Sequence, residues 1–340
     1  MKLSIIIPYY NGNKYISDVL EDLLCQDMSS DDYEIIVIDD DSTEEPVALQ
    51  DYCRRYPQIR YARYSHQGIS GARNRGIEMA KGDYVFFCDC DDRVRRNAFG
   101  RLVDLASEKR LEMLFFEITY LFEDIPYQPS SVPEGNPVLS EEPLSGDAYL
   151  ARRPRMQCGP WHFITQRKYL LESGIRFADE AFGIEDQMFM LRILLASSRA
   201  AHVNMEVYGY VRRKRSFSNY TGKVLQARRF AEGRLWFVSR ILETIRPGLL
   251  CEDCIRRRAG RVAFQMLHTN LLYLPFNENL DMIKRLKAVG AYPITSLYEG
   301  YPWLRRIMNI YPVWTGCCLA YHILPRFAKE LICKRLQQRN

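Results

Sequence analysis

The chain has 340 residues, 47% of them hydrophobic and 26% charged, a composition that excludes disordered, collagen-like and coiled-coil proteins. Its 47 basic and 42 acidic side chains give a formal net charge of +5. The longest apolar runs have the length of strands, and the N-terminus lacks a secretory signal, so we expect a cytoplasmic protein without membrane-spanning helices. The ten cysteines follow no repeated spacing and are expected to be reduced thiols.

The first 122 residues alternate between apolar runs typical of buried strands and segments with the apolar spacing of amphipathic helices. Strands are expected at 3–8, 33–39, 59–64 and 83–89, and helices at 14–26, 44–56 and 69–81. Because parallel strands joined through helices require right-handed crossovers, this order predicts a doubly wound, Rossmann-like α/β domain with a mostly parallel sheet.

The next segment, 123–146, carries five prolines and is expected to be a loop. Beyond it we expect strands at 161–165 and 200–211, helices at 167–173 and 186–196, and mostly helix after residue 222. The predicted domains are therefore a catalytic domain at 1–220, with halves at 1–110 and 111–220, and a helical extension at 221–340.

Charge is distributed unevenly along the chain. Residues 1–204 carry 33 acidic and 23 basic side chains, whereas residues 205–340 carry 9 and 24. A basic C-terminal third favours an anionic partner, and we expect no nucleic acid because no recognition motif for it is present. The nearly uncharged segment 310–324, flanked by arginines, is typical of a helix lying on an anionic membrane surface, although aromatic side chains at helical spacing also suit a core.

Two acidic clusters follow expected strands. Residues 39–41 end one strand, and Asp89, Asp91 and Asp92 follow another. Ligands of open α/β sheets bind at the carboxyl ends of the strands, so both clusters are expected at one crevice. Clustered carboxylates suit a hard cation that holds a diphosphate, and the sequence favours Mg²⁺ or Mn²⁺ at Asp89 and Asp91. Helix capping and ordinary turns are the structural alternatives for each cluster alone.

The glycine-rich segment 68–76 follows the third strand, and its glycine spacing disfavours a dinucleotide-binding dehydrogenase. Its helix N-terminus and its two arginines, Arg73 and Arg75, still suit a phosphate group.

Five blocks, in this order, resemble family-2 glycosyltransferases of the GT-A fold, as found in bacterial capsular and cell-surface polysaccharide synthesis. They are Ser4-Ile5-Ile6-Ile7-Pro8-Tyr9-Tyr10-Asn11, residues 34–42 ending in Asp39-Asp40-Asp41-Ser42, Gly71-Ala72-Arg73-Asn74-Arg75-Gly76, residues 82–92 with Asp89-Cys90-Asp91, and Glu185-Asp186. The resemblance implies inverting transfer of a sugar from a nucleotide diphosphate sugar, most often a UDP-sugar, to a hydroxyl of a glycan or lipid-linked acceptor. Asp41 stands where the family more often has glycine.

The resemblance also assigns roles. It makes 1–110 the nucleotide-sugar-binding half of the catalytic domain and 111–220 the acceptor-binding half. Pro8 and Tyr10 would line the nucleoside pocket, Asp40 with Asp39 beside it would read the uracil and ribose, and Arg73 would lie near the nucleotide and sugar. Asp89 and Asp91 would form the DxD element, with Asp91 the direct metal ligand. Arg213, and less so Arg212, would contact the leaving group, although a solvated basic turn is the usual explanation of such a run. Trp161 and His162 would border the acceptor pocket, although Trp161 could equally pack in the core.

Asp186 would be the catalytic base. An inverting displacement needs one carboxylate to accept the acceptor proton, and Asp186 is expected at a helix N-terminus, whose field lowers a carboxylate pKa. Two rivals stay open: a catalytically silent sugar-nucleotide-binding or membrane-scaffold protein, and a nucleotidyltransferase. The intact Asp89, Asp91 and Asp186 disfavour the first. The second rival, a nucleotidyltransferase, would carry a glycine-rich loop directly after the first strand. If the protein contacts the cell membrane, we expect it at the inner face, which borders the cytoplasm.

Overall fold

The structure is a computed structural model that describes residues 1–128, 130–133, 135–156, 158–213, 224–294 and 309. The chain divides into two compact units. The first comprises Met1–Asp179 and Glu185–Asn219, and the second comprises Glu180–Ile184 together with the chain from Tyr220 onward. Each unit is described by itself.

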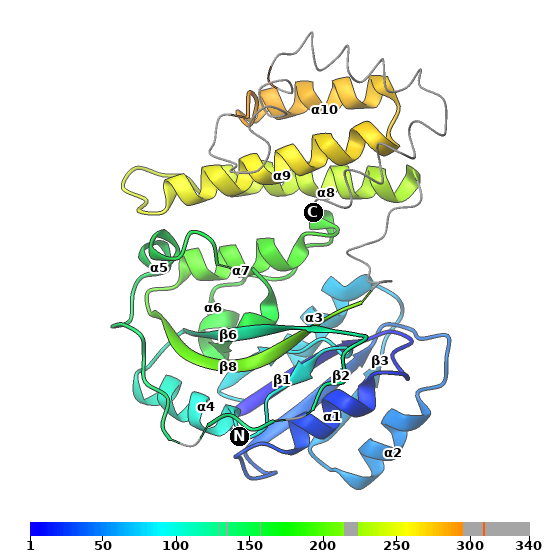
Figure 1. Ribbon diagram of the computed structural model, residues 1–340, viewed down its shortest axis with the longest axis vertical. Coiled ribbons are helices and arrows are strands. Elements are labelled where there is room, and N and C mark those ends of the chain that lie inside the picture. Colours follow the sequence, from blue (N-terminus) through cyan, green and yellow to red (C-terminus); the bar gives the residue numbers. More distant parts are fainter. Residues whose placement is uncertain (129, 134, 157, 214–223, 295–308, 310–340) are drawn as a thin grey trace. The chain divides into compact units, whose positions relative to one another are not determined.

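The first unit is built on an eight-stranded sheet with the order β3-β2-β1-β4-β7-β6-β8-β5. Figure 1 shows β1, β2 and β3 side by side, and β6 beside β8. The strands are β1 (Leu3–Tyr9), β2 (Tyr33–Asp39), β3 (Ile59–Arg63), β4 (Tyr84–Phe87), β5 (Arg93–Val94), β6 (Met113–Phe122), β7 (Phe163–Gln166) and β8 (Ala200–Arg212). Four neighbouring pairs are parallel, including β1 with β2 and β6 with β8, and three pairs, all involving β7 or β5, are antiparallel. The predicted mostly parallel α/β sheet is confirmed.

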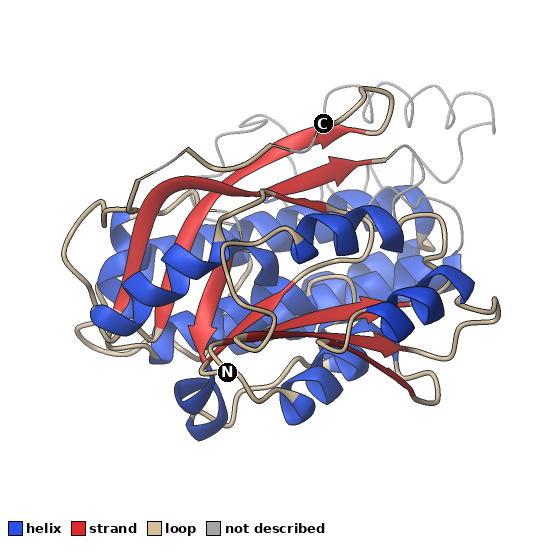
Figure 2. Cartoon of the chain, turned by 90° about the horizontal axis from the view of Figure 1, so that it is seen from below, coloured by secondary structure: helices blue, strands red, loops and turns tan. Residues whose placement is uncertain are grey.

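Helices cover the sheet because the strands of its parallel half are apolar on both faces. These helices are α1 (Ile16–Leu24), α2 (Val47–Arg55), α3 (Gly68–Met79), α4 (Phe99–Glu108), α5 (Gly146–Arg152), α6 (Arg167–Glu172) and α7 (Glu185–Ala196). Every residue of β1 and β2 is buried. Figure 2 shows the twisted strands with helices lying along them.

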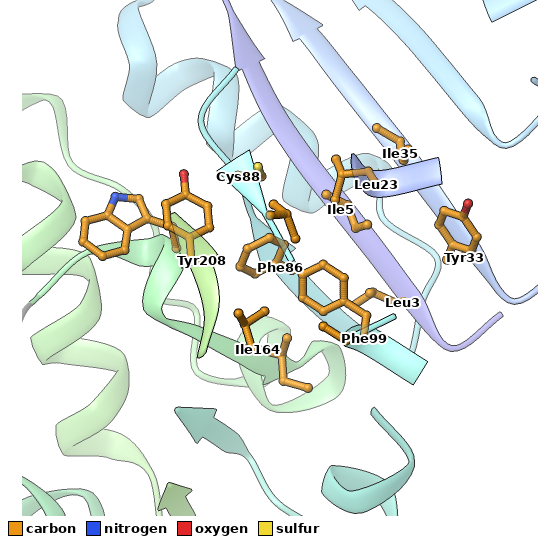
Figure 3. Packing of buried hydrophobic residues seen from close by; sticks show 14 of the residues in the cluster. Leu3, Ile5, Leu23, Tyr33, Ile35, Phe86, Cys88, Phe99, Ile164 and Tyr208 are labelled. Carbon is orange, nitrogen blue, oxygen red and sulfur yellow. The ribbon is translucent and has the colours of Figure 1, made fainter. Parts of the chain in front are cut away.

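Alternate residues of β1 serve different helices. Ile5 joins the buried cluster that includes Leu20 and Leu23 of α1, together with Phe86 and Phe99 (Figure 3). Ile6 faces α3, where a Cβ added to Gly76 would lie 2.2 Å from Ile6 Cγ2. A glycine is therefore required at residue 76, because the helix approaches the strand too closely for a larger side chain.

One predicted strand boundary was wrong. Residues 160–162 form a 3₁₀ turn, Pro160–His162, and the strand starts only at Phe163. Pro160 lies at the start of this turn, where its fixed φ suits a helical conformation. The described residues of the predicted loop contain no helix or named strand before α5 begins at Gly146, although Leu139 and Leu144 each form an isolated bridge to β8.

The second unit contains helices α8 (Val224–Leu242), α9 (Glu252–Tyr273) and α10 (Phe276–Ala288), which confirms a helical C-terminal extension. Buried Asn279 stabilises the turn between α9 and α10, since its side-chain amide donates to the carbonyl oxygens of Asn270 and Leu274. In the described part of the chain, no helix has both the length and the apolar character needed to cross a membrane. The segment 310–324, expected at a membrane surface, lies outside the described residues.

Candidate active site

The first unit has a cavity of about 470 Å³ beyond the ends of β1, β2 and β4. Its lining includes eight residues that the sequence singled out: Pro8, Tyr10, Asp40, Arg73, Asp89, Asp91, Asp186 and Arg213. These come from six separate segments of the chain. The parallel register explains the meeting of the two acidic clusters, because β1 lies between β2 and β4 and all three strands end at the same edge.

Arg73 is the most deeply buried cation of this cavity. Its side chain is 1% exposed, and Nη2 donates to Asp89 Oδ1 over 2.8 Å. Nε and Nη1 are buried and make no hydrogen bond within the described residues. Leaving such donors without a partner costs free energy, so Arg73 is a buried cation that is only partly satisfied within the described residues, and it lies in the lining of the cavity. Arg75 has a different environment, since it bonds to exposed Glu78 of the same helix.

Asp89 and Asp91 occupy the turn that follows β4. Arg213 Nη1 donates to Asp91 Oδ2 over 2.7 Å, and its guanidinium lies 4.5 Å from the centre of the Tyr15 ring. Burial and the neighbouring charge of Asp89 raise the pKa of Asp91, while Arg213 opposes the shift. The turn therefore carries negative charge that two arginines balance only in part.

The chemistry of this turn suits a hard cation. Arg73 and Arg213 each bond one carboxylate oxygen of the pair, and the other oxygens, Asp89 Oδ2 and Asp91 Oδ1, accept no hydrogen bond within the described residues. Among those residues, no cluster of three or more His, Cys, Asp or Glu is arranged to hold a metal. The donor set is thus two carboxylates, which suits an ion that keeps waters and takes its remaining ligands from a diphosphate.

Tyr208 and Asp92 hold this turn in place, and sequence reasoning gave neither residue a role. Tyr208 is fully buried; its hydroxyl donates to Asp92 Oδ2 over 2.7 Å and accepts the Asp89 backbone N–H at 3.2 Å. Asp92 Oδ1 accepts the Val211 N–H. No local sequence pattern signals this bridge, because the two segments are more than one hundred residues apart.

Asp186 lies in the first turn of α7, beside Glu185. The expectation that the helix N-terminus lowers its pKa was wrong: burial and the negative charge of Glu185 raise the pKa of Asp186 to about 7, although Arg73 opposes them. Desolvation outweighs the helix field because the carboxylate faces the cavity rather than bulk water. A carboxylate with a raised pKa is a stronger base than an ordinary aspartate.

The three consecutive aspartates after β2 have three different environments. Asp39 is fully buried and does not line the cavity; its carboxylate accepts hydrogen bonds from Tyr61 Oη and Ser42 N–H. Asp40 lines the cavity and accepts the backbone N–H groups of Gln67 and Gly68, which fixes the start of α3. Asp41 is exposed, bonds to Arg63, and has a φ of +67°. This left-handed backbone is the physical reason why glycine suits the position.

At the mouth of the cavity, Tyr10 is 50% exposed and its ring lies 5.5 Å from that of exposed His66. His66 Nδ1 lies 2.8 Å from Asp40 Oδ2. Sequence reasoning missed His66, which lies in a loop without an informative pattern. Pro8, at the end of β1, completes this side of the lining.

Trp161 and His162 are both buried, each with 7% of its surface exposed. The Trp161 ring stacks parallel to Tyr208, with centroids 5.3 Å apart, and lies 5.3 Å from Tyr210. Trp161 thus supports the wall of the cavity that Tyr210 lines, whereas His162 packs against Phe115 and is not among the lining residues.

Comparison with known proteins agrees with this geometry. Residues 4–170 match the family model described as glycosyl transferase family 2. The chain carries a family-2 glycosyltransferase domain. The match spans Arg73, Asp89 and Asp91, whereas Asp186 and Arg213 lie beyond its end.

Relatives of this chain include an uncharacterized glycosyltransferase, EpsJ of Bacillus subtilis, 29% identical over 61% of this chain and 60% of EpsJ. Poly(ribitol-phosphate) beta-N-acetylglucosaminyltransferase TarS of Staphylococcus aureus is 24% identical over 63% of this chain and 36% of TarS. The matches thus cover less than two thirds of either relative. A crystal structure of TarS residues 1–349 with UDP-GlcNAc superposes with a TM-score of 0.68 at 19% identity, covering 95% of this chain and 92% of that one. This likeness confirms the GT-A fold.

Proposed function

We propose that the protein transfers a sugar, with inversion, from a nucleotide diphosphate sugar, most specifically a UDP-sugar, to a hydroxyl of an acceptor in cell-surface polysaccharide synthesis. The observation that carries the proposal is buried Arg73, whose Nε and Nη1 lack hydrogen bonds in a cavity shared with Asp89, Asp91 and Asp186. A buried cation with unused donors, next to carboxylates on the same cavity wall, suits a ligand with anionic and hydroxyl groups.

The donor would lie across the cavity in the following order. Tyr10 and Pro8 would contact the base, Asp40 would face the nucleoside, and Arg73 would donate to the diphosphate or the sugar. Asp39 would act indirectly, because its buried carboxylate fixes the loop that carries Asp40. TarS, whose structure contains UDP-GlcNAc, supports a UDP-sugar as the donor.

In the chemical step, the acceptor oxygen attacks the anomeric carbon while its proton passes to an Asp186 carboxylate oxygen. The bond between the anomeric carbon and the diphosphate oxygen breaks, and the diphosphate leaves with the electron pair. Arg73 and Arg213 would stabilise the charge that develops on the leaving group. A single displacement of this kind inverts the anomeric configuration.

We propose Mg²⁺ or Mn²⁺ as the cofactor, held by Asp91 with Asp89. Both carboxylates have an oxygen that accepts no hydrogen bond within the described residues, which supports this donor set. When bound, the ion would supply positive charge to the leaving diphosphate. Arg213, which bonds to Asp91 in the same cavity lining, would contact the diphosphate.

The acceptor would be a glycan or a lipid-linked glycan. The relatives named for poly(ribitol-phosphate) glycosylation support a cell-surface polymer as the product. We further propose that the protein works in the cytoplasm, at the inner face of the membrane, where the basic C-terminal third would contact anionic lipid.

The first test is release of UDP or GDP from a panel of nucleotide sugars, with Mn²⁺, Mg²⁺ or EDTA, using membrane extract as the acceptor source. We expect one donor to be turned over only with a divalent ion. Asp91→Ala and Asp186→Asn should each lower kcat/KM at least about a hundredfold, or roughly 2.7 kcal/mol of transition-state stabilisation. Asp104→Asn, which removes an exposed carboxylate paired with Lys2, is the matched control and should retain activity.

Binding of the same donors separates the alternatives. If no nucleotide sugar binds in the presence of either ion, the proposed function is wrong. If a donor binds but is never turned over with any extract, the protein is the silent sugar-nucleotide-binding form of the fold.

A further inference from the structure

A row of aromatic side chains leads away from the cavity along β6 and β8, which are neighbours in the sheet (Figure 1). In the parallel register Tyr120 lies beside Tyr210, and Phe122 lies beside Arg212. Because side chains alternate between the faces of a strand, these four residues share one face of the sheet. We name Tyr210, Tyr120 and Phe122 the aromatic strip.

The strip is continuous with the candidate active site. Tyr210 lines the cavity that contains Asp186. Its ring lies 5.9 Å from that of Tyr120 in an edge-to-face arrangement, and 5.3 Å from buried Trp161. Phe122, at the end of β6, is 47% exposed. The strip therefore begins in the cavity and ends at the surface of the first unit.

The rings are supported rather than buried. Tyr210 rests against Trp161, which is itself stacked on Tyr208, so the ring belongs to a rigid aromatic stack. Exposed Arg212 lies over the Tyr120 ring, with its guanidinium carbon 4.3 Å from the ring centre. Ordinary core packing would bury these rings, yet Tyr120 and Tyr210 stay partly exposed. A contiguous patch of partly exposed aromatic side chains beside a cavity is a candidate interaction surface.

We propose that the aromatic strip binds sugar rings of the acceptor chain and so presents the acceptor hydroxyl to Asp186. A pyranose ring has a flat face of C–H groups, which stacks on the electron-rich face of an aromatic ring, and a rim of hydroxyls. Tyrosine hydroxyls and the Arg212 guanidinium are suited to that rim. The strip starts where the reaction would occur, which favours a chain of sugars over a protein or a lipid surface. This inference rests on the proposed function.

The test uses three named probes, chitohexaose, cellohexaose and maltohexaose, titrated into the whole protein and followed by calorimetry and tryptophan fluorescence. At least one hexasaccharide should bind saturably, and more tightly than its disaccharide, because several sugars would contact the strip. Tyr120→Ala and Phe122→Ala should each weaken that binding at least about fivefold. Tyr56→Ala is the control. Tyr56 follows α2, next to β3 at the opposite edge of the sheet from β6 and β8, so this variant should bind the hexasaccharide as tightly as wild type does.

Nucleotide-sugar binding is measured on the same samples, with urea midpoints to show that each variant is folded. If the wild type binds a nucleotide sugar but none of the three hexasaccharides, the strip is not a sugar-binding site and only this inference fails. Hexasaccharide binding that survives within twofold in the Tyr120→Ala, Phe122→Ala double variant also overturns it. Absence of nucleotide-sugar binding by the wild type would instead refute the proposed function.

Discussion

Replacing Tyr208 by phenylalanine removes one hydroxyl from the centre of the bridge that holds the turn carrying Asp89 and Asp91. That hydroxyl donates to Asp92 Oδ2 over 2.7 Å and accepts the Asp89 N–H over 3.2 Å. Asp92 is 3% exposed and Tyr208 is fully buried, so water entering from the cavity would replace the lost group only in part. One hydrogen bond to a charged group contributes about 1.5–3 kcal/mol, and an unsatisfied buried N–H costs about 1–3 kcal/mol.

With partial relaxation, Tyr208→Phe should therefore lower the free energy of unfolding by about 2–4 kcal/mol, measured by urea denaturation. The turn that carries Asp89 and Asp91 would lose its anchor to β8, so affinity for a nucleotide sugar with Mn²⁺ should fall at least about tenfold, or 1.4 kcal/mol. Burial and the charges of Asp89 and Asp91 already raise the pKa of Asp92 well above its usual value. The variant should accordingly be less impaired at low pH, where Asp92 is protonated.

Tyr149→Phe is the matched control. Tyr149 is 1% exposed, and its hydroxyl lies 3.2 Å from His202 Nδ1, away from the cavity lining. It should lose stability without losing donor affinity. The reasoning is refuted if Tyr208→Phe unfolds within about 0.5 kcal/mol of wild type and binds donor equally well, or if both variants lose donor affinity to the same extent.

Three further predictions concern aspartates. Because the pKa of Asp186 is raised to about 7, kcat/KM should fall about tenfold per unit as pH drops below 7, and this acidic limb should be absent from the residual activity of Asp186→Asn. The raised pKa also means that ionised Asp186 destabilises the folded state, and this effect grows as pH rises from about 4 to 7. At pH 8, Asp186→Asn should therefore unfold at a higher urea concentration than wild type. Below about pH 4 the two proteins should unfold at the same urea concentration. Asp41→Gly relieves the strain of a φ of +67° but loses an exposed ion pair with Arg63. The free energy of unfolding, measured by thermal denaturation, should therefore rise by up to about 1 kcal/mol. A loss of stability would show that the ion pair outweighs the backbone strain.

The sequence by itself determined the elements of the parallel half of the sheet. Strands buried on both faces leave continuous apolar runs, and amphipathic helices leave a regular spacing, so both can be recognised locally. The same reasoning placed Asp40, Asp89 and Asp91 at one edge, because the carboxyl ends of neighbouring parallel strands must meet. It also anticipated Arg73, which follows from the position of the glycine-rich segment at the start of α3.

Only the tertiary structure separated neighbouring residues of the same type. Asp39, Asp40 and Asp41 are chemically identical in the sequence, yet Asp39 is buried beneath Tyr61, Asp40 fixes α3, and Asp41 takes a left-handed backbone. Arg73 and Arg75 are two residues apart on one helix, and its geometry directs one into the cavity and the other to the surface.

The pKa of Asp186 and the role of Tyr208 also depended on contacts between distant segments. A helix N-terminus can be recognised in the sequence, but the desolvation that raises the Asp186 pKa arises only when α7 faces a cavity formed by other elements. Tyr208 meets Asp89 and Asp92 because β8 runs back through the sheet beside the turn that follows β4. Local patterns specify strands and helices, whereas burial and partner choice are properties of the assembled fold.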